Sequence, residues 1–550
     1  MKINYEKESI RYMKKKLQWC VIVASLLFLA VFLCRESIAA KLRADVIEVP
    51  VVSREEIAEL IDGKTQEAFG FAKVWFDEAR VPYDKESNTL FIPQNISDAY
   101  WQGELTARKK GAKLYFLTDE LLGDKEEAIA SGHAFTLYYL EDGAYATYQL
   151  VFTGMPVMII SGKKDIGAPE DRNWTADMQL YDPYHSASKI QKSKCNYHVR
   201  GGSSQHYHKS NFKLELEGKK LSLLGMRVDD DWILNSLYDD AGLIHNKVST
   251  SVWREIANYN NVPNDEGMTQ EYVELFLGTR YVGVYTLGER VDQTTLSLKD
   301  EDILYKCRAD RIPEEHNYTN ENTDEMRPIF VLKYPKEPSA EDWNPLKDWV
   351  NYFCKDRLTS YEQGKALLNM ENSVDYNLFT LLICGVDNIR KNVFLVAEYQ
   401  GDGTYQFKKV PWDMNATWGN PWVYDATCNY TIYDPSYIEN MSTWPTDMDT
   451  LYDYGEAEMS VLLRDRWKEL RENGVITKEK IYEMLNEEFS YLHGSGAYER
   501  NYALWTNGTE FWQDEFIYEY ADARIDVLDE YFEKLCKEAA QKAGSNLGAE

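Results

Sequence analysis

The segment Gly385–Gly419 reads GVDNIRKNVFLVAEYQGDGTYQFKKVPWDMNATWG and gives the strongest indication of the fold. Val393–Glu398 and Tyr405–Val410 are rich in β-branched and aromatic residues, and the turn Gly401-Asp402-Gly403 lies between them. Two such runs joined by a glycine turn predict a β-hairpin. A hairpin holds its two ends together, so polar residues that flank it in sequence are expected to meet at its base.

Three polar residues flank this hairpin: Asp387 and Asn392 precede it, and Asp413 follows it. Asp387 is placed to accept a proton from a hydroxyl nucleophile, while Asn392 and Asp413 offer the oxygen ligands that Mg²⁺ or Mn²⁺ prefers. An Asp, an Asn after four intervening residues, a hairpin and a second Asp form the order used by protein kinases. The segment predicts metal-dependent phosphoryl transfer. The alternative is an ordinary turn, because D-x4-N also arises by chance.

A second segment with candidate binding residues is Tyr197–Ser204, which reads YHVRGGSS and is followed by Lys209. Consecutive small residues let backbone amides approach a phosphate, and hydroxyls and a lysine add donors and positive charge. The segment is not a Walker loop, which reads GxxxxGK[ST] and opens a helix. A plain hairpin turn is the alternative interpretation.

The composition is that of a globular protein with a strong acidic excess. The chain has 550 residues, with 61 Lys and Arg against 90 Asp and Glu, and a formal net charge of −29. Charge of this sign argues against nucleic acid as a partner, because such binding needs cations that displace phosphate counterions. It does not exclude nucleotides, since a divalent metal bridges acidic side chains to phosphates.

The N-terminal segment predicts a membrane anchor. Residues 1–16 carry six basic and two acidic side chains, and residues 17–34 are uncharged. As a helix this run is roughly 27 Å long, enough to cross a bilayer core. Basic residues before the span keep the N-terminus cytoplasmic, so a single-pass cell-membrane protein with an extracellular bulk is expected. The alternative is a signal peptide cut after Ile38-Ala39-Ala40.

The remaining chain is divided from its sequence into a linker, two folded regions and a tail. Residues 35–50 are the expected linker, 51–151 an accessory module, 152–540 the main domain and 541–550 a flexible tail. In the accessory module a helix is expected over Ile57–Phe76, followed by short strands. In the main domain, apolar spacing predicts a helix over Asp240–Ile256 that is capped by Asp239 or Asp240. A further hairpin is expected around Gly278.

These segments together resemble the CotH kinase family, the spore-coat protein kinases and their extracellular relatives. The resemblance covers roughly residues 152–535. The matching segments, in the order of the family, are Arg200–Ser204 with Lys209, Asp231–Asn235, Asp240–Lys247, Val273–Tyr285 with Glu289, Asp387–Asn392 and Trp412-Asp413.

The resemblance implies an α+β, atypical bilobal protein-kinase-like fold that transfers phosphate from ATP with Mg²⁺ or Mn²⁺. It implies that Asp387 is the catalytic base and that Asn392 and Asp413 are metal ligands. It also implies that Lys209 holds ATP phosphates and that Glu289 lies near the nucleotide where the lobes join. Over the phosphates it places Arg200, Ser203 and Ser204.

Two residues depart from the family pattern. Asn415 stands where many relatives carry a second Asp, which removes a negative charge near the metals. His245 stands where relatives often have Arg. Neither departure removes the set Asp387, Asn392 and Asp413.

The sequence therefore predicts an exported, membrane-anchored kinase that acts on Ser or Thr of a surface protein. The alternative is a catalytically degenerate CotH-like scaffold or adhesion protein. A glycan-active protein ranks last; abundant Tyr and Trp and the acidic pair Glu314/Glu315 suggest it, but any acidic chain offers such pairs. The pair His206 and His208 has no third ligand in the sequence and is expected to be structural.

Overall fold

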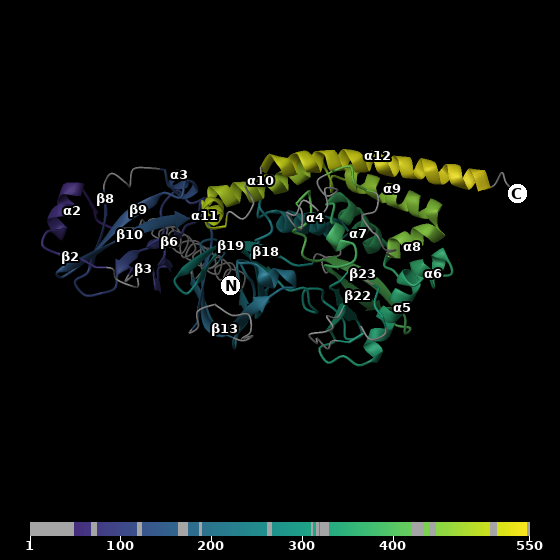
Figure 1. Cartoon of the computed structure of the whole chain (residues 1–550), viewed down its shortest axis with the longest axis horizontal. Coiled ribbons are helices and arrows are strands. Elements are labelled where there is room, and N and C mark those ends of the chain that lie inside the picture. The colour runs from purple at the N-terminus through teal and green to yellow at the C-terminus, as the bar shows by residue number, and fades with distance from the viewer. Residues whose placement is uncertain are drawn as a thin grey trace, which may run out of the picture. The chain divides into compact units, whose positions relative to one another are not determined.

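The computed structural model describes residues 49–67, 74–117, 124–162, 174–185, 190–260, 267–309, 312–314, 318–319, 329–420, 434–438, 447–505 and 514–546. The predicted membrane anchor, residues 17–34, lies outside these ranges. No helix within them combines the length and the apolar character that crossing a membrane requires. The chain divides into two compact units, Met1–Met155 and Pro156–Glu550, which are described separately (Figure 1).

The first unit is built on a mixed β-sheet in the order β1-β8-β9-β10-β6-β5, with β2 paired to β10. The strands expected in this region are confirmed. The helix expected over Ile57–Phe76 is wrong in extent, because the chain turns at Gly63, whose φ is +70°, and continues as strands. The elements are β1 (Val51–Val52), α2 (Arg54–Ile61), β2 (Thr65–Gln66), β3 (Val74–Phe76), β4 (Ala79–Arg80), β5 (Tyr83–Asp84), β6 (Thr89–Pro93), β7 (Leu105–Ala107), β8 (Lys113–Leu117), α3 (Lys125–Ala130), β9 (Ala134–Glu141) and β10 (Ala144–Thr153).

The second unit begins with a closed β-barrel in the order β11-β12-β13-β14-β17-β19-β18. Its strands alternate, so that Phe212, Leu214 and Leu216 of β14 fill the barrel core. A parallel pairing of β11 with β18 closes the barrel, and the hairpin predicted around Gly278 is confirmed as β18 and β19. The strands are β11 (Val157–Gly162), β12 (Trp174–Tyr181), β13 (Ile190–Arg200), β14 (Asn211–Leu216), β17 (Asp231–Asn235), β18 (Gln270–Leu277) and β19 (Arg280–Glu289), with a small separate pair β15 (Leu221–Ser222) and β16 (Val228–Asp229).

A four-stranded antiparallel sheet follows the barrel in sequence, in the order β21-β20-β22-β23. One of its faces contributes Tyr305 and Leu395 to the largest hydrophobic core, shared with the helices. The other face contributes Leu304 and Phe394 to a smaller cluster that includes Ile233 of barrel strand β17. The sheet therefore packs between the helices and the barrel. Its strands are β20 (Ile303–Cys307), β21 (Phe330–Tyr334), β22 (Val393–Tyr399) and β23 (Tyr405–Pro411).

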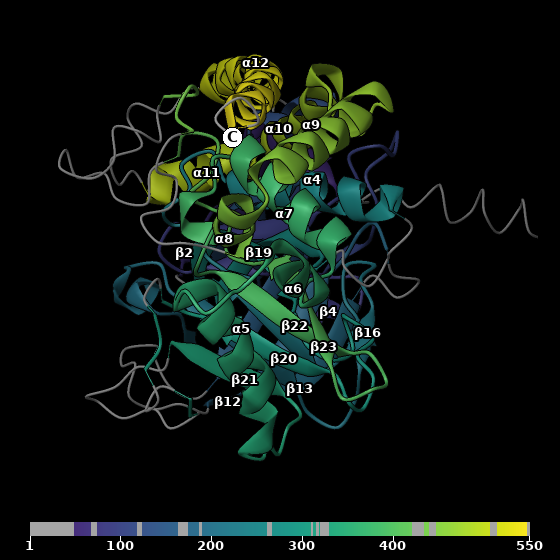
Figure 2. The same cartoon turned by 90° about the vertical axis from the view of Figure 1, so that its right-hand side faces the viewer.

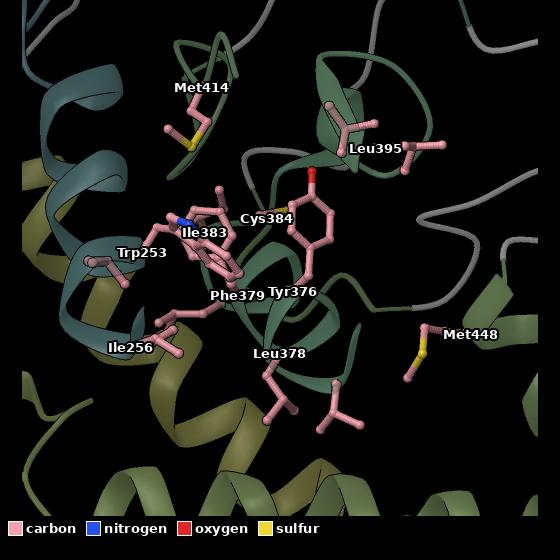
Figure 3. Close-up of a cluster of buried hydrophobic side chains, with 14 of the residues drawn as sticks. Trp253, Ile256, Tyr376, Leu378, Phe379, Ile383, Cys384, Leu395, Met414 and Met448 are labelled. Atoms are coloured by element: carbon pink, nitrogen blue, oxygen red, sulfur yellow. The ribbon is translucent and has the colours of Figure 1, made fainter. Parts of the chain in front are cut away.

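Most of the helices cover the sheet on the side away from the barrel strand β17, whereas α11 packs against barrel strand β19. Figure 3 shows part of their core, where Trp253, Tyr376 and Phe379 point toward one another. Helices α9, α10 and α12 lie together along one side of the unit (Figure 2). The helices are α4 (His245–Tyr259), α5 (Asn344–Cys354), α6 (Tyr361–Ala366), α7 (Met370–Leu382), α8 (Asp447–Tyr454), α9 (Glu456–Glu472), α10 (Lys478–Gly494), α11 (Ala497–Leu504) and α12 (Asp514–Asn546).

Helix α4 begins later than predicted, and its expected cap is wrong. The N-cap position is Ile244, whose side chain makes no capping hydrogen bond. Asp240 still satisfies the first turn, because its Oδ2 accepts a hydrogen bond from the His245 amide at 2.9 Å and its Oδ1 lies 2.7 Å from His245 Nδ1. Both side chains are buried. Asp240 thus stabilises the first turn of the helix although it does not occupy the N-cap position, whereas the side chain of Asp239 makes its hydrogen bonds elsewhere.

Taken together, the strands and helices make the second unit a mixed α+β structure.

Candidate active site

The hairpin predicted from the sequence is confirmed as β22 and β23. Val393 pairs with Pro411 at its open end, and the Trp412 amide donates a hydrogen bond to the Asn392 carbonyl at 3.0 Å. Asn392 and Asp413 are therefore neighbours at the base of the hairpin, although they lie far apart in sequence.

A buried side chain that sequence analysis missed holds this base together. Asn388 is fully buried, and its Nδ2 donates to the Trp412 carbonyl at 2.8 Å and to the Asn392 carbonyl at 3.3 Å. Its own carbonyl accepts a hydrogen bond from the Tyr376 hydroxyl at 2.7 Å. Asn388 thus joins both ends of the hairpin to helix α7. These bonds join residues that are far apart in sequence, so no local pattern predicts them. The only sequence signal for Asn388 was its position next to Asp387.

Asp387 precedes Asn388 in a single 3-10 turn, Val386–Asn388. Its Oδ1 lies 3.0 Å from Lys391 Nζ, and 23% of its side-chain surface is exposed. The carboxylate is thus held near the base of the hairpin and still reachable by a substrate hydroxyl. A partly exposed carboxylate can accept a proton from a hydroxyl group, so the predicted role of Asp387 as a general base remains possible to test.

Asn392 and Asp413 share an uncommon backbone conformation. Their φ angles are +55° and +59°, in the left-handed region that Asn and Asp tolerate better than other side chains. Such residues persist where the surrounding structure fixes them, and they cluster at functional sites. Here the strand pairing and Asn388 supply that constraint, so the two predicted ligands are held in defined positions.

The barrel contributes Arg200 to the same place. Arg200 ends β13, and its Nη1 donates to Asn235 Oδ1 at 2.7 Å. Its guanidinium lies 5.5 Å from the centre of the Trp412 ring. Burial lowers the pKa of Arg200, and the nearby Asp413 carboxylate opposes this shift. A cation from the barrel therefore faces the Trp412-Asp413 segment of the sheet.

A second carboxylate, Asp239, also lies here and was interpreted from the sequence only as a possible helix cap. Its Oδ2 accepts hydrogen bonds from Asn415 Nδ2 at 2.8 Å and from the Tyr207 hydroxyl at 3.3 Å. Burial and, to a smaller extent, the negative charge of Asp413 together raise the pKa of Asp239 to about 7. Asn415, the departure from the family pattern, thus holds another carboxylate near Asp413.

Lys209 is not part of this group in the structure. Its side chain is buried, and Nζ donates to the Val284 carbonyl at 2.6 Å and to Asn501 Oδ1 at 2.9 Å. It also lies 4.8 Å from the centre of the Tyr285 ring. Burial lowers the pKa of Lys209 well below its usual value. The structure thus places this lysine between β19 and α11, and its ATP-binding role stays a prediction.

Glu289 is likewise engaged elsewhere. Its Oε1 accepts a hydrogen bond from the Arg227 amide at 3.1 Å, and its Oε2 accepts one from the Thr269 amide at 3.2 Å. The Arg227 guanidinium completes an ion pair at 3.5 Å. These contacts tie Glu289 to the neighbouring strand and loop, and its predicted place near a nucleotide stays untested.

The small-residue turn after Arg200 is a 3-10 turn, Ser203–His206. Gly201 has a φ of +128°, and a Cβ atom there would lie 2.1 Å from the Ser204 hydroxyl. The turn therefore requires glycine at this position. Because the turn follows Arg200 directly, it begins beside the Trp412-Asp413 segment.

The oxygen atoms at this site fit a divalent cation that is shared with phosphate. Within the described ranges, no group of three or more His, Cys, Asp or Glu side chains is arranged to hold a metal. Mg²⁺, however, is usually bound by one or two carboxylates together with substrate phosphates. Asp413 would supply one such carboxylate and Asn392 a neighbouring amide oxygen, and a cation here would also reduce the effect of the Asp413 charge on Asp239.

Comparison with known proteins gives the family. A model described as CotH kinase protein matches residues 197–535, more than half of the chain, so the chain belongs to the CotH family. The curated protein "Inner spore coat protein H" of Bacillus subtilis (strain 168) is 22% identical over 265 residues, covering 46% of this chain and 67% of that protein. The resemblance stated from the motifs is thereby confirmed.

Proposed function

We propose that this CotH-family chain is a metal-dependent protein kinase with a bilobal, kinase-like main domain. It transfers phosphate from ATP to a Ser or Thr hydroxyl of another protein. One observation carries the proposal: the β22–β23 hairpin holds Asn392 beside Trp412-Asp413, with Asp387 one short turn away. The closeness of these three residues along the backbone supports a base and metal ligands of the kind that phosphoryl transfer uses.

Each side chain has a distinct role in this proposal. Asp387 accepts the proton of the acceptor hydroxyl, and Lys391 orients its carboxylate through their 3.0 Å contact. Asn392 and Asp413 would hold Mg²⁺ or Mn²⁺. When bound, the cation would neutralise negative charge on the phosphates. Arg200 faces this segment from the barrel and contacts phosphate oxygens.

A non-catalytic surface scaffold is the second candidate. Two observations favour it: Asn415 stands where many relatives carry Asp, and the Lys209 ammonium is already bonded to Val284 and Asn501. A scaffold keeps the fold and loses affinity for the nucleotide. Binding of ATP with metal therefore separates the two candidates.

The predicted location is part of the proposal. The chain is exported and anchored in the cell membrane by residues 17–34, with its N-terminus in the cytoplasm. The proposed protein substrate then lies at the cell surface. These statements rest on the sequence of residues 1–34 alone.

The test is phosphate transfer by the full chain in detergent, with labelled ATP and either Mg²⁺ or Mn²⁺. Asp387→Ala is expected to lower incorporation by about 10² to 10⁴-fold, the usual contribution of a general base. Asp402→Ala, in the exposed turn of the same hairpin, is the matched control and is expected to retain activity. Equal background incorporation by wild type and Asp387→Ala would overturn the kinase proposal.

A further inference from the structure

The two faces of the four-stranded sheet differ in chemistry. Tyr305 points into the helix-side core, whereas Leu304 packs on the barrel side. Lys306 shares the face of Leu304 because side chains alternate along a strand. Its neighbour in β22 is Phe394, which is on the same face. A lysine is thus placed on the side of the sheet that carries Trp412.

Two aromatic rings hold the Lys306 amine. Nζ lies 4.4 Å from the centre of the Trp412 ring and 5.2 Å from that of Phe394. Aromatic faces attract a cation without neutralising it. Among the described residues, none gives Lys306 a hydrogen bond or an ion pair, and its side chain is only partly buried. The two rings therefore orient the amine, and no acceptor among the described residues competes with a ligand for it.

Other cations surround the same position. Arg200 lies over the Trp412 ring as well, at 5.5 Å. Burial lowers the pKa of Lys306 well below its usual value, and Arg200, Lys333 and Arg308 add to that shift, while Asp413 opposes it. Burial also lowers the pKa of Lys333, to about 8, with a contribution from nearby arginines. Positive charges here destabilise one another.

This clustering runs against the charge of the chain. With a net charge of −29, carboxylates are abundant, yet among the main influences on the pKa of Lys306 three are cations and one, Asp413, is an acid. Like charges held together cost stability unless an anion joins them. Asp413 is also the candidate metal ligand, so an anion at this place would touch both the cations and the metal. A chain of phosphates has the charge and the number of oxygens to do so.

We infer that the barrel-facing side of this sheet holds a polyphosphate-binding site in which Lys306 is the central donor. Lys333 and Arg200 flank it. The identification of the ligand as the ATP triphosphate rests on the proposed kinase function. In this assignment Lys306, next to Trp412-Asp413, takes the phosphate contact that the family resemblance gives to Lys209. Lys209 instead joins β19 to α11.

The test measures binding of inorganic tripolyphosphate, and separately of ATP with Mg²⁺, to the full chain in detergent by calorimetry. Lys306→Gln is expected to weaken both affinities by at least about tenfold, as for the loss of a charge-assisted hydrogen bond. Lys306→Arg is expected to stay within about threefold of wild type, because it keeps the charge. Lys365→Gln, an exposed lysine of α6 paired with Glu362, is the matched control and should leave both affinities unchanged.

The outcomes separate this inference from the kinase proposal. If wild type binds tripolyphosphate and Lys306→Gln binds it equally well, the inference is wrong and the kinase proposal stands. If tripolyphosphate binding depends on Lys306 but no ATP binds and no phosphate is transferred, the site stands and the kinase proposal is wrong. Absence of tripolyphosphate binding by wild type at millimolar concentration would also overturn the inference. Should Lys306→Gln fail to fold, Lys333→Gln replaces it, with an expected loss of about threefold.

Discussion

Lys209 and Lys306 sit in two opposite environments of the same unit. The Lys209 ammonium is buried and donates to two protein oxygens, one from β19 and one from α11. The Lys306 amine is partly exposed, lies over two aromatic rings and has other cationic side chains nearby. Lys209 therefore has its hydrogen-bond acceptors within the protein, whereas Lys306 has no acceptor among the described residues.

The difference shows that a lysine in a motif can be hydrogen-bonded within the protein, while a lysine outside any motif can lack a protein acceptor. Lys209 follows the small-residue turn that resembles a phosphate-binding segment, yet its bonds are to the barrel and a C-terminal helix. Lys306 belongs to no motif noticed in the sequence. A buried amine with two acceptors stabilises the fold, whereas an amine held among cations without an acceptor costs stability, as expected if the proposed anion site is correct.

The largest expected effect is on stability at the Lys209 position. Lys209→Ala leaves a cavity and a buried Val284 carbonyl without its donor, so we expect it to lower the free energy of unfolding by about 3 kcal/mol. Chemical unfolding followed by tryptophan fluorescence measures this. If Lys209→Ala were no less stable than Lys306→Ala, the contrast between the two lysines would be broken.

The next effect concerns Asp239 and depends on pH. Because its pKa is raised to about 7 in the folded chain, above that of an unfolded Asp, folding favours its protonated form. The contribution of Asp239 to stability is therefore most favourable below about pH 4 and is lost as the pH rises from about 4 to about 7. Asp239→Asn removes this penalty, so at pH 8 the variant is expected to be more stable by about 2 kcal/mol, with little difference at pH 4.

Thermal melts at the two pH values, with and without Mg²⁺, measure the Asp239 effect. Mg²⁺ is expected to reduce the difference at pH 8, because a cation stabilises two facing carboxylates. An Asp239→Asn variant that is less stable than wild type at pH 8 would contradict the proposed repulsion between Asp239 and Asp413.

A smaller effect is expected at His493, which lies near α11, the helix whose Asn501 accepts a hydrogen bond from Lys209. Hydrogen bonds to Asp514 and Glu499, the latter in α11, raise the pKa of His493 to about 9. The stabilisation is full below about pH 6.5 and is lost as the pH rises through 9. Because His493 is partly exposed, we expect His493→Gln to cost only about 1 kcal/mol at pH 6 and almost nothing at pH 10. Unfolding curves at both pH values test this, and a cost that does not change with pH would refute it.

The smallest expected effect is the stability change in Lys306→Ala. Loss of a charge that its neighbours repel offsets the loss of contact with two rings, so we expect a change below about 0.5 kcal/mol. The same unfolding measurement detects it. A destabilisation as large as that of Lys209→Ala would show that Lys306 serves the fold rather than a ligand.

The sequence predicted the local parts of the site and missed the tertiary ones. The β22–β23 hairpin was predictable because its strands and turn are contiguous, and it carries Asn392 and Asp413 with it. Asn388 and Asp239 were missed because their partners lie in other elements: Asn388 bonds to Trp412, and Asp239 bonds to Asn415. Apolar periodicity and spacing do not report such contacts.

The sequence predicted several strands and helices of the main domain, but it did not predict that the strands close into a barrel. Strand patterns recovered the hairpin around Gly278. The start of α4 was misplaced because Asp240 acts on the His245 amide without occupying the cap position. Closure of the barrel depends on the parallel pair β11–β18, whose strands are separated by much of the barrel sequence, and no local pattern indicates it.

That pairing has a practical consequence for any shortened version of the protein. The family match starts at residue 197, whereas the barrel starts with β11 at Val157 and continues through β12. A fragment trimmed to the match would lose both strands and expose unpaired edges on β13 and β18, the kind of surface that promotes aggregation. A fragment that starts at Pro156 keeps every strand of the barrel, and we expect it to be a better choice for expression than one that starts at residue 197.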